Sequence, residues 1–129
     1  MKLLLDTHAF LWLKTEPARF SVATMQLLED PANSLHLSAA SAWEIAIKHA
    51  RGKLRLPVAP GRFVTQRMAQ SDISALPITL AHALLAGALP PHHADPFDRL
   101  LIAQAHLEKA ALLSADQQLR AYDVRIISL

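Results

Sequence analysis

Short apolar runs alternate with longer stretches of helical periodicity along this chain. A short apolar run bounded by turn-forming residues indicates a buried strand, whereas apolar residues recurring every three or four positions indicate a helix. The pattern predicts strands at residues 2–5, 35–38, 76–79, 111–114 and 124–128. It predicts helices at residues 8–14, 18–29, 38–53, 61–71, 80–87 and 96–110, with Pro31 and Gly52 marking the ends of the second and third.

Strands that alternate with helices predict an α/β fold, with a mostly parallel five-stranded sheet covered on both faces. Crossovers between parallel strands are right-handed almost without exception. The carboxyl ends of the strands therefore lie along one edge of the sheet, which is where open α/β sheets bind ligands. The length of 129 residues favours one domain spanning residues 1–129.

Composition narrows the class of protein. Apolar residues make up 52% of the chain, which excludes a disordered protein. The absence of cysteine excludes disulfides and thiolate metal sites, and it fits a reducing compartment. The N-terminal stretch MKLLLDTHAFLWLK lacks the features of a signal peptide. No window approaches the ~18 uninterrupted apolar residues of a membrane span, so we expect a cytoplasmic protein with no membrane contact.

The charge balance is close to neutral. Lys and Arg number 13 against 11 Asp and Glu, a formal net charge of +2, which permits a polyanionic partner without arguing for one. Basic residues gather in one segment, at Lys48, His49, Arg51, Lys53 and Arg55. Two interpretations stay open for this segment: a solvated helix end and loop, or a surface that faces phosphates.

Four acids lie near the carboxyl ends of the predicted strands or at the beginnings of the helices. Asp6 directly follows the first strand, and Asp116 follows the fourth. Glu44 lies in the first turns of the helix after the second strand, and Asp98 lies in the first turn of the helix that begins at residue 96. The predicted topology therefore brings all four acids to the same edge of the sheet.

Each acid also has a local interpretation as part of a helix cap. Asp6 and Asp116 precede helices, where a carboxylate can accept backbone N–H groups. Ser41 and Glu44 match the S-x-x-E capping box. In HHADPFDRLLIAQA, the Asp95-Pro96 pair matches an N-cap followed by proline. Asp98 then lies beside the positive end of the helix dipole.

Caps alone do not explain the surroundings of these acids. Glu44 sits within the apolar stretch WEIAI, and Asp98 shares a helical face with Leu101, Ile102 and Ala105, where an unpaired carboxylate is costly. Acids that converge at one edge repel one another unless cations neutralise them. Carboxylate ligands suit Mg²⁺ or Mn²⁺, which indicates phosphodiester chemistry. The chain lacks the glycine-rich nucleotide-binding motifs, which disfavours nucleotide-cradle enzymes.

Four stretches, in order, resemble the PIN-domain ribonucleases of the VapC toxin type: LLLDTHAFLW, SAASAWEIAIKHARGKL, HHADPFDRLLIAQA and LLSAD. The resemblance runs from residue 2 to about residue 123. It implies a three-layer α/β/α PIN-like domain and endonucleolytic cleavage of RNA that depends on Mg²⁺ or Mn²⁺. It also implies a VapB-type antitoxin as partner, which blocks the site in such modules, and a homodimer that forms a higher assembly with the antitoxin.

The resemblance assigns roles to individual residues. Asp6 and Asp98 match the acids that would bind the metal directly. Glu44 would complete the metal shell or position the water, and Asp116 would bind through water or hold a second ion. These four residues form the predicted catalytic set.

Accessory roles are expected for further polar residues near the predicted set. A hydroxyl at Thr7 would orient Asp6 and one at Ser114 would orient Asp116, while Asp95 would mainly cap its helix and add an outer contact. Weaker candidates, for contact with the RNA backbone, are Lys48, Arg51 and Arg99, although the pattern favours solvated helix surface for these residues.

Other interpretations remain at this point. A receiver-like phosphate regulator also gathers acids at a sheet edge, but it needs a lysine after the last strand, and residues 124–129 have none. A non-catalytic interaction module would use the acids only to stabilise the fold. The adjacent His92 and His93 do not have the spacing of a zinc site. We expect Trp12 and Trp43, in apolar helical stretches, to pack in the core.

Overall fold

The computed structural model describes residues 1–129 and contains a five-stranded sheet in which every neighbouring pair of strands is parallel. The strand order is β3-β2-β1-β4-β5, so β1 lies at the centre. The strands are β1 (Lys2–Leu5), β2 (Ser34–Ser38), β3 (Ile73–Leu76), β4 (Ala111–Leu113) and β5 (Ile126–Ile127). The predicted α/β class and five-stranded sheet are confirmed, and the sheet is parallel throughout.

Helices form the connections between the strands. They are α1 (Thr7–Thr15), α2 (Val22–Glu29), α3 (Ala39–Ala50), α4 (Pro60–Gln70), α5 (Leu80–Ala88) and α6 (Pro96–Glu108), with the short 3₁₀ helices η1 (Pro17–Arg19) and η2 (Gln117–Ala121). None of these helices combines the length and apolar character that crossing a lipid bilayer requires.

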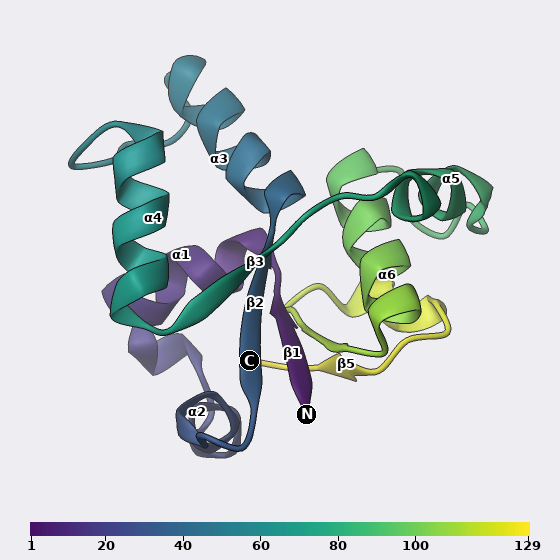
Figure 1. Ribbon diagram of the computed structural model, residues 1–129, viewed down its shortest axis with the longest axis horizontal. Coiled ribbons are helices and arrows are strands. Elements are labelled where there is room, and N and C mark those ends of the chain that lie inside the picture. The colour runs from purple at the N-terminus through teal and green to yellow at the C-terminus, as the bar shows by residue number, and fades with distance from the viewer.

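The central strand β1 is buried on both faces. Leu3, Leu4 and Leu5 are all fully buried, as expected for a continuous apolar run in a parallel sheet. Because side chains alternate along a strand, Leu3 and Leu5 join one cluster of core residues and Leu4 joins a second. Figure 1 shows α1, α2 and α4 on one side of the sheet and α5 and α6 on the other, which gives the three layers.

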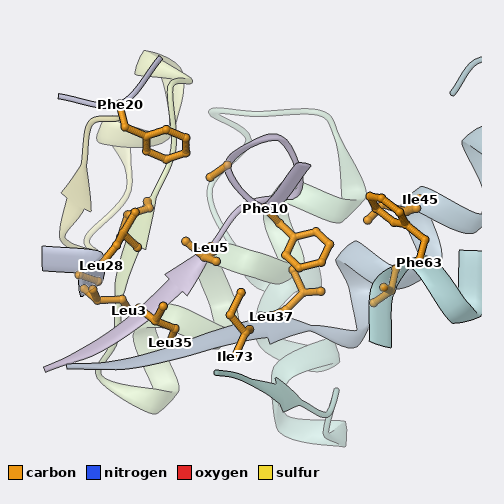
Figure 2. Close-up of a cluster of buried hydrophobic side chains, with 14 residues drawn as sticks. Leu3, Leu5, Phe10, Phe20, Leu28, Leu35, Leu37, Ile45, Phe63 and Ile73 are labelled. Atoms are coloured by element: carbon orange, nitrogen blue, oxygen red, sulfur yellow. The ribbon is translucent and has the colours of Figure 1, made fainter. Parts of the chain in front are cut away.

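The larger core cluster lies between the sheet and the first four helices. In Figure 2, Leu28 of α2 lies beside Leu3, and Phe10 of α1 lies between the leucines of the strands and the pair formed by Ile45 of α3 and Phe63 of α4. The rings of Phe10 and Phe63 meet edge to face, with centroids 6.5 Å apart. Burying one such side chain contributes about 1.5–3 kcal/mol. These contacts fix the start of α1 and the first half of α3 against the carboxyl ends of the strands.

The smaller cluster packs α6 against the opposite face of the sheet. Leu101, Ile102 and Ala105 are nearly fully buried beside Leu4 and Leu112. The apolar face of α6 is therefore the one that the sequence predicts. The same face carries Asp98 one turn earlier, at the edge of the sheet where β1 and β4 end.

Some predicted boundaries are wrong. The third strand was expected at residues 76–79, but β3 covers Ile73–Leu76, because Pro77 has no N–H to donate to the sheet. The second helix was expected from residue 18; instead Pro17–Arg19 forms a 3₁₀ turn, and α2 begins after the Ser21 cap. The predicted capping box of α3 is also wrong, because its N-cap is Ser38 and both Ser41 and Glu44 lie inside the helix.

Candidate active site

The four predicted acids line one open pocket of about 320 Å³ at the carboxyl edge of the sheet, which we call the acidic pocket. Its lining residues are Asp6, Thr7, His8, Trp12, Glu44, Lys48, Asp95, Asp98, Ala115 and Asp116. The acids come from the end of β1, from α3, from the first turn of α6 and from the segment after β4. Parallel topology brings them together, since these strands all end at this edge.

Asp6 is held at the junction of β1 and α1. Its backbone N–H donates to the Leu113 carbonyl at 3.0 Å, and its Oδ1 accepts the N–H of Ala9 at 2.7 Å. The residue is 6% exposed, and this burial raises the pKa of its carboxyl group above the ordinary value. Hydrogen bonds from Ser114 and Ala9 oppose the shift, while the Glu44 charge adds to it. Asp6 thus acts as a cap and also presents an acid to the pocket.

Glu44 has a partner on each oxygen. The Thr7 hydroxyl donates to Oε1 at 2.7 Å and lies 3.0 Å from the Ser41 hydroxyl. Lys48 Nζ lies 2.7 Å from Oε2. The expectation was that the Thr7 hydroxyl would orient Asp6. In the structure it hydrogen-bonds Glu44 instead. The structure also gives Lys48 an ion-pair partner within the pocket.

Asp98 and Asp116 flank a histidine that was not predicted to be part of the site. His93 Nε2 lies 2.9 Å from Asp116 Oδ2 and 3.4 Å from Asp98 Oδ2. One potential ligand atom from each of these three residues falls in a group whose members lie within 4.8 Å of one another. Two acids that approach one imidazole this closely show that Asp98 faces the site and not the solvent.

The environment of Asp98 disfavours its charged form. Burial and then the neighbouring Asp95 carboxylate raise the pKa of Asp98 to about 7. The charges of Asp6 and Glu44 act in the same direction, and His93 opposes them. The carboxylates of Asp95, Asp6 and Glu44 therefore act electrostatically on Asp98, and a bound cation would relieve this repulsion.

Hydrogen bonding determines which nitrogen of His93 carries a proton. The N–H of Asp95 donates to His93 Nδ1 at 3.1 Å, so Nδ1 presents its lone pair. In the neutral ring, Nε2 then carries the hydrogen and donates it to Asp116. His93 in this geometry is a donor to the acids and offers them no lone pair for a shared metal.

Asp95 and Ser114 behave as accessory residues. Asp95 Oδ1 accepts the N–H of Phe97 at 2.8 Å and that of Asp98 at 3.4 Å, so the predicted N-cap is confirmed. Ser114 Oγ accepts the N–H of Asp116 at 3.1 Å and also hydrogen-bonds Asp6. One hydroxyl thus links two of the acids.

Arg99 is engaged with the protein. Its guanidinium donates to the carbonyl oxygens of Ala86, Leu89, Pro90 and His93 and to the Tyr122 hydroxyl. Tyr122 in turn accepts the His93 N–H and donates to the Pro90 carbonyl, both at 2.9 Å. Arg99 therefore holds the loop that carries His93, and its donors are directed at the protein. Arg51, exposed at the C-terminal end of α3, lies almost two turns beyond Glu44.

Two expectations about aromatic residues have different outcomes. Trp43 is 59% exposed, so its predicted place in the core is wrong; its ring meets Phe97 edge to face. Trp12 is partly buried and packs against the larger core cluster, but it also lines the acidic pocket. Helical periodicity misplaced Trp43 because α3 is apolar over more of its circumference than the part that faces the sheet.

The donors in the acidic pocket fit a hard divalent cation. They are carboxylate oxygens, with hydroxyl groups behind them and no sulfur ligand. Lys48 neutralises part of the Glu44 charge, and His93 Nε2 contacts the other pair, but Asp6 forms no salt bridge. The pocket therefore retains an excess of negative charge that Mg²⁺ or Mn²⁺ would balance.

Comparisons with known proteins agree with this architecture. The PIN domain family model matches residues 3–125. Ribonuclease VapC22 of Mycobacterium tuberculosis is 33% identical over 120 residues, covering 92% of this chain and 90% of that protein. Ribonuclease VapC16 of the same organism is 44% identical over 59 residues, covering 46% of this chain and 42% of that protein.

Solved structures share the fold. VapBC2 from Rickettsia felis, bound to a promoter DNA fragment, superposes with a TM-score of 0.74 at 12% identity, covering 99% of this chain and 98% of that chain. VapBC-1 from nontypeable Haemophilus influenzae gives 0.67 at 18% identity, with the same coverage. A family model over nearly the whole chain excludes the receiver-like alternative. This chain belongs to the PIN-domain family, in the group that includes the VapC ribonucleases.

Proposed function

We propose that this protein is a metal-dependent endoribonuclease toxin that hydrolyses RNA phosphodiester bonds in the acidic pocket. One observation carries the proposal. Four acids from separate parts of the chain line a single open pocket, where burial and then the neighbouring carboxylates raise the pKa of Asp98 to about 7. A carboxyl group with so strongly raised a pKa in an open pocket is typical of a functional site, and a bound cation would offset the repulsion. The kinship with Ribonuclease VapC22 supports RNA as the substrate.

The acids divide into two roles. Asp6 and Asp98 would hold Mg²⁺ or Mn²⁺ directly, while Glu44 and Asp116 would act through water or at a second ion. When bound, the ion supplies a Lewis acid that lowers the pKa of water and stabilises charge on the phosphate. Hydrogen bonds keep the acids in place, from Thr7 to Glu44 and from Ser114 to Asp6. They reduce the reorganisation that the reaction requires.

The proposed reaction is an in-line displacement at phosphorus. Water attacks the phosphodiester, the bond to O3′ breaks, and the products carry a 5′-phosphate and a 3′-hydroxyl. Lys48, 40% exposed beside Glu44, would contact the phosphate backbone where it enters the acidic pocket. No serine nucleophile or histidine base is needed for this chemistry.

The proposed partners follow from the same kinship. Related folds are found in VapBC and in FitAB complexes, which pair a toxin with an antitoxin. We propose that a VapB-type antitoxin neutralises this protein in the cytoplasm, and that a homodimer of the toxin assembles further through the antitoxin. An antitoxin that covers the acidic pocket would exclude RNA from it.

A cleavage assay tests the proposed function. Purified protein is incubated with single-stranded RNA in Mg²⁺, in Mn²⁺ and in EDTA, and the product ends are mapped. Asp6→Asn and Asp98→Asn should abolish cleavage, and so should EDTA. Asp123→Asn, which changes an exposed acid outside the acidic pocket, serves as the matched control and should cleave normally. Normal cleavage by Asp98→Asn in Mg²⁺ would refute the proposal, and no cleavage by any form would favour a non-catalytic module.

A further inference from the structure

A second cavity lies beside the acidic pocket and shares part of its wall. It has a volume of about 500 Å³ and lies between α1, α3, the segment 53–57 and α4. We call it the basic cavity. The two hollows share four lining residues: Thr7, His8, Trp12 and Lys48. A ligand strand that lies in the acidic pocket can therefore continue into the basic cavity along the protein surface. The volume of the basic cavity falls within the ~300–1,000 Å³ of pockets that hold small organic groups.

The charge of the basic cavity is opposite to that of the acidic pocket. Lys48, Lys53, Arg55 and Arg67 line it. The one acid among its lining residues is Glu16, whose Oε1 lies 3.1 Å from Arg19 Nε. Lys53 and Arg55 are exposed and form no salt bridge, which leaves their donors free for a polyanion. Lysine and arginine side chains in this arrangement fit phosphate groups.

Aromatic rings stand at the boundary between the two hollows. His8 is exposed, and its ring centroid lies 5.2 Å from that of the partly buried Trp12, with the planes tilted by 35°. The guanidinium of Arg19 covers Trp12 at 4.1 Å from the ring centroid. Leu54 and Phe63 contribute apolar surface deeper in the cavity. Flat rings beside cations are the combination that single-stranded nucleic-acid sites use.

We propose that the basic cavity is a subsite for single-stranded RNA, which holds a nucleotide next to the scissile phosphate. The base contacts His8 and Trp12, and Lys53, Arg55 and Arg67 hold the flanking phosphates. The inference rests on the proposed function and deepens it, because it assigns a place for the substrate outside the acidic pocket. The cations favour RNA over an apolar protein segment as the occupant, and the shared wall gives the RNA a continuous path.

The two tryptophans provide an optical test. Trp43→Phe leaves Trp12 as the single fluorophore, and Trp12→Phe leaves the exposed Trp43. Each variant is titrated in EDTA with a single-stranded RNA octamer and with an octamer of abasic ribose-phosphate. RNA should quench Trp12 saturably and leave Trp43 unchanged, and the abasic chain should bind without quenching. Equal quenching of both fluorophores, or none, would overturn the base contact.

The charged contacts are tested by salt dependence. Binding of the octamer to Lys53→Ala/Arg55→Ala/Arg67→Ala is compared with wild type by fluorescence anisotropy at several salt concentrations. Each lost phosphate contact reduces the slope of log K against log salt by about 0.7, so three contacts reduce it by about 2. Lys14→Ala/Arg62→Ala, with both changes at exposed positions outside the cavity, is the matched control. Circular dichroism verifies that both variants are folded.

The outcomes separate this inference from the proposed function. Normal RNA cleavage combined with unchanged binding by the triple variant would refute the subsite and leave the nuclease intact. Loss of cleavage by every form, with RNA binding that depends on the basic cavity, would refute the nuclease and leave the subsite intact. Unchanged RNA affinity with weakened binding of an antitoxin would assign the cavity to a protein segment and overturn the inference.

Discussion

Substitution of Asp98 by asparagine should stabilise the metal-free protein at alkaline pH while it abolishes metal binding. The pKa of Asp98 is raised from 3.8 to about 7 by burial and by neighbouring acids. A shift of about 3 units corresponds to about 4 kcal/mol at ~1.36 kcal/mol per unit. The side chain is 24% exposed, so water reaches it and we expect about half of that value.

The pH dependence follows from proton linkage. Between pH 4 and 7, the folded protein keeps a proton on Asp98 that the unfolded chain has released. The free energy of unfolding therefore falls as the pH rises through this range, and above pH 7 the full cost of the buried charge is present. Asparagine carries no charge at any pH. The variant should exceed wild type by less than about 1 kcal/mol at pH 5, where only part of the cost is present, and by about 2 kcal/mol at pH 8, which corresponds to roughly 8 °C in Tm for a chain of this size.

Thermal unfolding by circular dichroism in EDTA, at pH 5 and pH 8, measures the effect, with Asp123→Asn as the control. Addition of Mg²⁺ at pH 8 should raise the Tm of wild type and leave that of Asp98→Asn unchanged. A variant that is equally destabilised at both pH values would refute the reasoning, because it would show that the carboxylate contributes a favourable contact and not an unfavourable charge.

Two further substitutions test the scaffold of the site. Arg99→Ala removes donors to four carbonyl oxygens and a hydroxyl, so it should lower the free energy of unfolding, measured by urea denaturation, by about 2–4 kcal/mol. The control Arg62→Ala, at an exposed position, should change it by less than about 0.5 kcal/mol, and equal effects of the two substitutions would contradict the role assigned to Arg99. Thr7→Val removes the donor to Glu44 and should reduce the cleavage rate about tenfold in a folded protein, with Thr7→Ser restoring it; a fully active Thr7→Val would exclude this positioning role.

Parts of this protein with strong local patterns were predicted well from the sequence. The run KLLL predicts a strand buried on both faces, and its place at the centre of the sheet makes Asp6 the first acid of the site. Asp95 followed by proline predicts the cap of α6 correctly. The spacing of Asp98 from Leu101 and Ile102 places this acid at the top of the buried face of α6.

Other parts depend on contacts that periodicity does not encode. His93 enters the site because Arg99 and Tyr122 fix its loop, and Tyr122 lies far along the chain. The edge strand β3 buries only Ile73, and its run ISAL is interrupted by a serine, so the sequence pattern does not separate this strand from the overlapping LPIT. The partner of Thr7 was misassigned because Glu44 lies on another helix, where a tertiary contact determines the hydrogen bond.

The position of β1 between β2 and β4 has a consequence for when the protein becomes active during its synthesis. Asp6 is translated well before β4, yet its backbone N–H donates to the Leu113 carbonyl, and Asp116 follows two residues after Ser114. A nascent chain that ends before β4 has neither the neighbour that supports the end of β1 nor the fourth acid. Translation must therefore pass β4 and Asp116 before the four acids can meet at one edge of the sheet, so a shorter nascent chain has no complete acidic pocket.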